Sequence, residues 1–413
     1  MSRPYPHDAP VAVESVPRWP SRIGSRGWVL SLAALTAVVA LSIDMSLPAQ
    51  PTLASNFDVA AEDAQLTLSL FMVGFAGCQL VIGYFADAWG RRRVIAGGLV
   101  VFVFGGIGCA FSPTIEILIA CRVLQGAGAA AGPVVARAMV RDTQPAAKAA
   151  GILSTMLAAL AIAPMLAPMI GGQLLYFLNW RAIFATLAIA GIAMFTLART
   201  TLSETLPVER RTTASIRGLF RSYRRFFATP GTRLPMLVFC ATFAGQFAYI
   251  ADSPFVLLEG FHVSNTAYAF YFASTALALM LGSMTGGRML RAGRSPRTMV
   301  VIGGAILAFG GASLALATYL ELGIAGFMVP IAVYFFGAGI VGPSATALTM
   351  EPVPEIAGTA SATIGCLVMV SGALSGYLTT RIGGSDPAVF SKVIVVMSAI
   401  AFSLALLSAR RRR

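Results

Sequence analysis

Three polar side chains lie inside long apolar stretches of the sequence, where they could carry a proton or bind a polar group. Asp44 is the only acid in the window 28–50, and Arg122 and Gln125 lie one helical turn apart in the window 115–141. A charged side chain at hydrocarbon depth costs about 3 kcal/mol or more unless it faces the interior of a helix bundle and has a partner. The sequence therefore predicts interior positions for these residues, as candidates for substrate binding and proton coupling.

Asp44 and Arg122 are expected at similar depths in the membrane. If consecutive apolar windows alternate in direction, Asp44 lies about six residues before the outer end of its helix, and Arg122 about seven residues after the outer start of its own. We therefore expect the two side chains to share one polar network. The alternative is that Arg122 only donates hydrogen bonds to backbone carbonyls.

Another acid lies near the end of the apolar window 233–256. Asp252 follows Tyr249 and Phe247, and these aromatic side chains could line a cavity together with it. Asp252 is closer to the expected membrane surface than Asp44 is. A solvated helix end is therefore the favoured interpretation, and a role in coupling, with Tyr249 beside it, is the alternative.

The segment GYFADAWGRRR, which begins at Gly83, joins two apolar windows. Gly83 allows a neighbouring helix to approach closely, and Gly90 allows a turn that other residues resist. Asp87 can cap a helix or pair with an arginine such as Arg91 or Arg92. The segment therefore predicts a tight turn that holds an acid and a basic cluster.

The apolar window 149–176 contains the segment AIAPMLAPMIGGQL. Pro164 and Pro168 each remove a backbone donor, which bends a helix. The pair Gly171 and Gly172 lets a neighbouring helix pack closely. A helix that only kinks for packing is the simpler interpretation of this segment.

The elements that position these residues are apolar helices. The chain has 413 residues, of which 57% are hydrophobic and 11% charged, whereas soluble proteins carry about 25% charged residues. A helix needs about 20 apolar residues to cross the hydrocarbon core. The sequence offers twelve such windows: 28–50, 64–86, 94–112, 115–141, 149–176, 180–201, 233–256, 266–290, 298–318, 324–349, 357–380 and 388–409.

The basic residues indicate how these spans are oriented. The formal net charge is +13, and most of the thirty Lys and Arg residues fall on one side of the membrane if the spans alternate. By the positive-inside rule both termini are expected in the cytoplasm. Orientation thus accounts for the charge, and no nucleic-acid partner is needed.

The longest polar stretch between spans divides them into six and six, an arrangement typical of transporters with a site between two halves. We expect five parts: a disordered cytoplasmic tail (1–26), an N-terminal six-helix half (27–201), a basic cytoplasmic linker (202–232), a C-terminal six-helix half (233–409) and a basic tail (410–413).

Several of these segments resemble known family motifs. The segment from Gly83 resembles motif A of the major facilitator superfamily, with Ala88 where a basic residue is usual. The segment around Arg122, RVLQGAGAAAG, resembles motif B of drug:proton antiporters. The proline-rich segment resembles their motif C, with Ala167 in place of its first Gly. The stretch LSIDMSLPAQP around Asp44, and ARAMVRD further on, resemble the bicyclomycin-resistance subfamily of drug exporters.

The resemblance implies an all-α membrane protein with twelve transmembrane helices in two six-helix halves. It implies a charge latch at motif A that stabilises the outward-facing state, and an arginine, Arg122 here, tied to proton coupling. Motif C argues for export. We therefore expect a proton-coupled exporter of small lipophilic compounds or antibiotics in a bacterial inner membrane, monomeric, and driven by the proton gradient without a cofactor.

Two alternatives remain. A transporter of an endogenous metabolite could use the same fold, and the direction of flux would distinguish it. A membrane-embedded enzyme or receptor would need clustered His, Cys or acids within the spans. The sequence has only His7 and His262, five scattered cysteines and no Gly-x4-Gly-Lys-Ser/Thr nucleotide-binding segment. We therefore expect no metal site and no catalytic centre.

Overall fold

The computed structural model describes residues 23–211, 216–383 and 386–410. Most of the expected tail 1–26 lies outside the described residues, and so do positions 411–413 of the expected C-terminal tail. The first helix begins at Arg26, at the boundary expected for the N-terminal half.

Within the described residues the chain forms helices, and twelve segments are long and apolar enough to cross a bilayer. These segments correspond one to one to the twelve expected windows. Helices form because the hydrocarbon offers no water, so each backbone N–H and C=O must be paired within its own segment. The expected all-α membrane fold is confirmed.

The N-terminal spans comprise eight helices: α1 (Arg26–Asp44), α2 (Gln50–Phe57), α3 (Ala61–Trp89), α4 (Arg91–Ala110), α5 (Ile115–Ala129), α6 (Ala131–Thr143), α7 (Ala146–Phe177) and α8 (Trp180–Thr201). The C-terminal spans comprise six: α10 (Pro230–Pro254), α11 (Asn265–Arg291), α12 (Pro296–Tyr319), α13 (Gly323–Met350), α14 (Ala357–Gly383) and α15 (Pro387–Arg410). Shorter elements connect or extend them: η1 (Leu47–Ala49), η2 (Val208–Arg210), α9 (Ile216–Ala228), η3 (Phe255–Gly260) and η4 (Pro354–Ile356).

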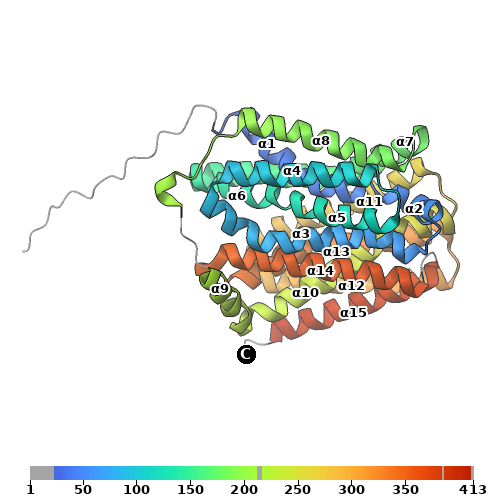
Figure 1. Cartoon of the computed structure of the whole chain (residues 1–413). Helices are drawn as coiled ribbons and strands as arrows, with labels where there is room; N and C mark the ends of the chain where they lie inside the picture. Colours follow the sequence, from blue (N-terminus) through green and yellow to red (C-terminus); the bar gives the residue numbers. More distant parts are fainter. Residues whose placement is uncertain (1–22, 212–215, 384–385, 411–413) are drawn as a thin grey trace, which may run out of the picture.

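The spans form two bundles that lie side by side along one direction (Figure 1). In the N-terminal half, α5 packs on α3 and α4, and α1 on α7; in the C-terminal half, α13 packs on α11 and α12, and α10 on α14. The most extensive contacts between the halves are those of α3 with α14 and of α7 with α11. The site between the halves is therefore bounded by helices of both.

The first helix of each half changes geometry just after an acidic residue. Helix α1 ends at Asp44 and continues as the 3-10 turn η1, which contains Pro48. Helix α10 passes Asp252, reaches Pro254 and continues as the π-helix η3. Proline lacks the N–H that would continue an α-helix, and irregular turns re-satisfy the freed carbonyls. Each acid is thus carried by a discontinuous helix.

The segment expected as a basic linker contains helical elements in its described part. Between α8 and α10 it contains η2 and α9, and residues 212–215 lie outside the described part. Helix α9 packs on α10 and α14, at the ends of those helices (Figure 1). The linker therefore contributes a helix to the surface of the C-terminal half.

Candidate site between the two halves

Arg122 of α5 is fully buried and joins three helices of the N-terminal half. Its guanidinium donates hydrogen bonds to the backbone oxygens of Thr67 in α3 and Ser42 in α1, both at 3.1 Å. It also donates to Oε1 of Gln125 at 2.7 Å. The Phe71 ring stacks against it, with 4.2 Å from Cζ to the ring centroid. These contacts fix the break after α1 relative to α3 and α5.

Asp44 lies two residues beyond the carbonyl that Arg122 binds. It is 4% exposed, and it forms no ion pair among the described residues. Across the boundary between the halves, its carboxyl is close enough to act electrostatically on the hydroxyl of Tyr268 in α11. Asp44 and Arg122 are therefore connected through the backbone of α1, in place of a direct ion pair.

Asp252 does not lie at a solvated helix end, so that interpretation of the sequence is wrong. It is fully buried, because η3 extends α10 beyond it and α14 covers it. The hydroxyl of Thr380 in α14 donates a hydrogen bond to its Oδ1, and its Oδ2 has no partner. The next residue, Ser253, shares a 3.1 Å hydrogen bond with the Tyr268 hydroxyl. Asp252 therefore lies next to a residue that joins α10 to α11.

Tyr249, the aromatic residue expected beside Asp252, lies in the core of the C-terminal half. It is fully buried and packs against rings of three other helices of the C-terminal half. The centroid distances are 6.2 Å to Phe272, 5.3 Å to Phe335 and 6.4 Å to Phe390. The Tyr249 ring therefore belongs to the apolar core of that half.

Motif A forms a charged cluster at one end of the bundle. Arg91 pairs with Asp87 one turn away, and its Nε bonds to Oδ2 of Asp142 at 2.9 Å. Gly90 has a φ of 97°, a conformation that favours glycine, so the expected turn is confirmed. A Cβ added at Gly83 would meet no atom within 4 Å, so the expectation that Gly83 allows close helix packing is wrong. Gly83 lines the cavity described below.

Two carboxylates of this cluster were missed by sequence reasoning. Glu204 accepts hydrogen bonds from the backbone N–H of Arg91 at 2.9 Å and of Arg92 at 3.2 Å, so it caps α4. The Arg92 guanidinium donates a hydrogen bond to the backbone carbonyl of Arg199 at 2.6 Å. Asp142 is the last residue of the ARAMVRD segment, whose family resemblance could have identified it. Glu204 lies 113 residues after Arg91, and no local pattern identifies it.

The proline-rich segment lies within α7, which continues through Pro164 and Pro168. Gly171 faces the backbone carbonyl of Met45, so a side chain there would collide with the break after α1. Gly172 faces Asn265 at the start of α11, where an added Cβ would make an ordinary contact at 3.6 Å. At this glycine pair α7 therefore contacts two neighbours. Gly171 packs on the break after Asp44, and Gly172 packs on α11 of the C-terminal half.

A cavity of about 520 Å³ opens at the motif A end of the bundle. It is lined by both halves and by α9, with polar members Gln79, Tyr84, Asp87, Arg141, Tyr223 and Thr359. At the opposite end, η1 packs against α10 and α2 packs against η3, so the halves are in contact there. The structure is therefore open towards one side of the membrane.

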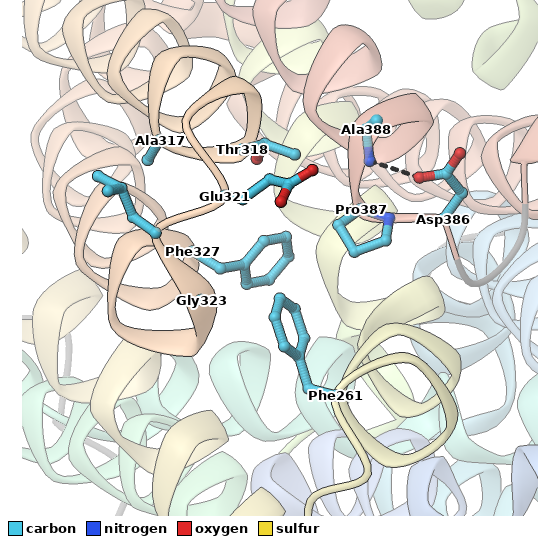
Figure 2. Close-up of a pocket in the computed structure, with 10 residues that line it drawn as sticks. Phe261, Ala317, Thr318, Glu321, Gly323, Phe327, Asp386, Pro387 and Ala388 are labelled. Atoms are coloured by element: carbon cyan, nitrogen blue, oxygen red, sulfur yellow. Dashed lines mark hydrogen bonds between the residues drawn. The ribbon is translucent and has the colours of Figure 1, made fainter.

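A second cavity, of about 360 Å³, belongs to the C-terminal half alone (Figure 2). The rings of Phe261 and Phe327 pack together at one wall, with 5.5 Å between their centroids. The Glu321 carboxylate points into the cavity (Figure 2). The Asp386 carboxylate is engaged by the backbone N–H of Ala388 at 2.7 Å. This cavity touches neither Asp44 nor Arg122, so it lies apart from the site between the halves.

Two six-helix bundles with discontinuous helices and buried charges at their boundary form the architecture of a secondary transporter. A family model described as Major Facilitator Superfamily matches residues 32–376, and the chain belongs to this family. It is accordingly a multi-pass membrane protein, and its family is one of transporters and not of enzymes.

Relatives that match over most of the chain carry transporter or drug-resistance names. An uncharacterized MFS-type transporter, YdgK, from Bacillus subtilis is 32% identical over 93% of this chain and 96% of its own. The bicyclomycin resistance protein homolog of Haemophilus influenzae is 27% identical over 91% and 95%. Multidrug resistance protein D of Escherichia coli is 29% identical over 86% and 88%.

Solved structures agree on the fold. The xylose transporter XylE from E. coli, in a partially occluded inward-open conformation, matches with a TM-score of 0.69 at 15% identity, over 92% of this chain and 96% of its own. A bacterial homolog of the human lysosomal transporter Spinster, inward-facing and unoccupied, matches with a TM-score of 0.72 at 17% identity, over 94% and 98%.

Proposed function

We propose that this protein exports small lipophilic compounds, antibiotics among them, across a bacterial inner membrane in exchange for protons. The observation that carries the proposal is the buried carboxyl of Asp44, held at the boundary between the halves by an α1 break that Arg122 fixes. The names of the bicyclomycin-resistance and multidrug-resistance relatives support the choice of drug-like substrates.

The arrangement supports the following cycle. Substrate reaches the site through the cavity at the motif A end, which is cytoplasmic by the positive-inside rule. When the opposite end opens, a proton from outside binds Asp44 and the substrate leaves. The proton is released to the cytoplasm once the protein returns to the conformation described above. Each proton supplies about 2.3 kcal/mol per 100 mV, which sustains about a fifty-fold gradient, so no cofactor is needed.

Motif A has a place in the same cycle. Asp87 and Gly83 line the cavity opposite Gly358 and Thr359 at the start of α14. Closing the cavity would bring these two walls together, with Arg91 holding Asp87 and Asp142 in position. We infer that the cluster stabilises the outward-facing state, as the resemblance to motif A implies.

The proposed arrangement in the membrane follows from charge. Both termini lie in the cytoplasm, together with the motif A turn and the linker segment. The five parts anticipated from the sequence serve as the working domain division, with α9 added to the linker. The site lies within one chain, between its own halves, so a monomer is sufficient for function.

The proposal is tested by drug susceptibility in a pump-deficient bacterium that expresses wild type or Asp44→Asn, with amphenicols in the drug panel. We expect resistance with wild type, loss of resistance with Asp44→Asn, and loss of efflux when an uncoupler collapses the proton gradient. The matched control is Asp58→Asn, which changes the same group at an exposed position of the same segment.

Two outcomes would contradict the proposal. Resistance that persists in Asp44→Asn would remove Asp44 from the mechanism. Absence of resistance to the whole panel, with the protein present in the membrane, would favour a transporter of an endogenous metabolite on the same fold.

A further inference from the structure

Helix α9 presents two chemically different faces. Its inner face packs on the C-terminal half: Phe226 is fully buried in an apolar cluster with Met236 of α10 and Ile364 of α14. Its outer face is exposed and consists of three arginines and one phenylalanine at helical spacing: Arg217, Phe220, Arg221 and Arg224. The inner face explains how α9 is held, and the outer face has no part in that packing.

Specific contacts attach α9 to both halves. The Tyr223 hydroxyl donates a 2.7 Å hydrogen bond to the carbonyl of Leu80 in α3. Burial raises the pKa of the Tyr223 phenol to about 12, so this donor keeps its proton at physiological pH. Arg225 pairs with Glu355 at 3.2 Å. The position of α9 is therefore defined at the mouth of the large cavity.

These contacts place α9 near one surface of the membrane, with the Tyr223 side chain reaching inward. Leu80 lies nine residues before Trp89, the last residue of α3, which is about 13 Å inside that end of the helix. Helix α3 has 29 residues and is about 43 Å long, which matches a whole bilayer with its headgroups. Leu80 therefore lies below an interfacial layer that is about 7 Å thick. The Tyr223 side chain reaches down to it from α9, which lies beside the ends of α10 and α14 (Figure 1).

The outer face combines positive charge with an exposed ring. Arg217, Arg221 and Arg224 surround a hollow of about 510 Å³ together with Phe220, whose side chain is 68% exposed. Within the described residues none of these three arginines forms an ion pair. The positive-inside rule would account for the three arginines, but it does not account for the exposed ring of Phe220. The planar guanidinium of arginine binds phosphate with two parallel hydrogen bonds, and an apolar ring near the membrane surface can pack against a lipid acyl chain.

We propose that the outer face of α9 binds an anionic phospholipid, with the headgroup phosphate between Arg217, Arg221 and Arg224 and the upper acyl chain against Phe220. The surface potential of an anionic leaflet attracts such a basic, amphipathic helix. A bound lipid would hold α9 at the interface, where Tyr223 contacts α3. The proposal concerns binding and does not depend on the transported substrate.

The test uses the purified full-length protein and native mass spectrometry, with titration of phosphatidylglycerol and, separately, phosphatidylcholine. The triple variant Arg217→Gln, Arg221→Gln, Arg224→Gln is expected to bind phosphatidylglycerol about 100-fold more weakly, since three arginines near an anionic surface are lost. Phosphatidylcholine binding should stay unchanged. The matched control removes three exposed arginines from the α11–α12 junction: Arg288→Gln, Arg291→Gln and Arg294→Gln.

A second variant separates the lipid from a soluble anion. Phe220→Ser keeps all three charges and is expected to weaken phosphatidylglycerol binding several-fold, while inorganic phosphate should compete poorly with the lipid. Equal losses in the triple variant and its α11–α12 control would overturn the proposal. So would wild-type affinity in the triple variant, or binding of inorganic phosphate or an acidic peptide that needs the arginines but not Phe220.

If the triple variant fails to fold, as judged by its thermal midpoint, the single variant Arg221→Gln with the control Arg291→Gln gives the same comparison. Lipid binding is measured without transport, so a failed lipid test leaves the proposed export activity standing, and the reverse also holds.

Discussion

Arg122 is unusual because its charge is fully buried and its partners are mainly neutral. Two backbone carbonyls and the Gln125 amide oxygen accept its hydrogen bonds, and a Phe71 ring covers it. Charge-assisted bonds of this kind stabilise a buried guanidinium, and each places one helix. We interpret Arg122 as the residue that positions the α1 break, while Asp44 carries the exchangeable proton.

Arg122→Lys tests this positioning role. A lysine ammonium is a point charge that cannot reproduce the planar fork, so it cannot reach Ser42, Thr67 and Gln125 together. We expect the variant to insert in the membrane but to retain about a tenth of wild-type transport or less. Transport of a labelled substrate into inverted vesicles measures this. Near wild-type rates in Arg122→Lys would mean that charge alone is required.

The connection between Asp44 and Arg122 is testable by substrate binding to the purified protein, which stays measurable where transport is lost. A double-mutant cycle with Asp44→Asn and Arg122→Ala should give non-additive effects on binding, because both changes act through one turn of α1. Fully additive effects would argue against a shared network.

Thr380 has the corresponding role for Asp252. Its hydroxyl is the one hydrogen-bond donor to Asp252 in the described structure, and Oδ2 already lacks a partner. Thr380→Val should lower the free energy of unfolding by about 1–3 kcal/mol, because it leaves a buried carboxyl unbonded. The control Thr380→Ser keeps the hydroxyl. Equal thermal midpoints for the two variants in detergent would contradict this account.

At the scale of elements, helix packing around the α1 break depends on one glycine. Gly171 of α7 lies against the Met45 carbonyl, where any Cβ meets backbone that cannot yield easily. We expect Gly171→Ala to lower the thermal midpoint and to impair transport by displacing α1. Gly151→Ala in the same helix is the control, because nothing lies within 4 Å of its added Cβ. Tolerance of both changes would show that the contact is unimportant.

The helices themselves could be predicted from the sequence, because a span is a local property of about 20 apolar residues. The turn at Gly90 and the pairing of Asp87 were also predictable, since their signals lie within one short segment. The burial of Asp252 was not, because it depends on η3 and on α14, which is far along the chain. The same reason explains Glu204, which caps α4 from the end of α8.

For the whole molecule, the arrangement of contacts describes one state of a cycle. The halves meet at the η1 and η3 end and separate around the cavity at the motif A end. The acids at the two helix breaks, Asp44 and Asp252, lie towards the closed end, and α9 lies at the open end. A rocking motion that closes one end and opens the other would move the site between the two sides of the membrane.

The measurement that tests the central claim most directly is drug transport by purified protein in proteoliposomes under an imposed pH gradient. Wild type and Asp58→Asn should accumulate the best drug from the susceptibility panel against its gradient, and an uncoupler should abolish this accumulation. Asp44→Asn should show none, although it inserts and folds. Undiminished, gradient-driven accumulation by Asp44→Asn would contradict the account, since the proton would then be carried elsewhere.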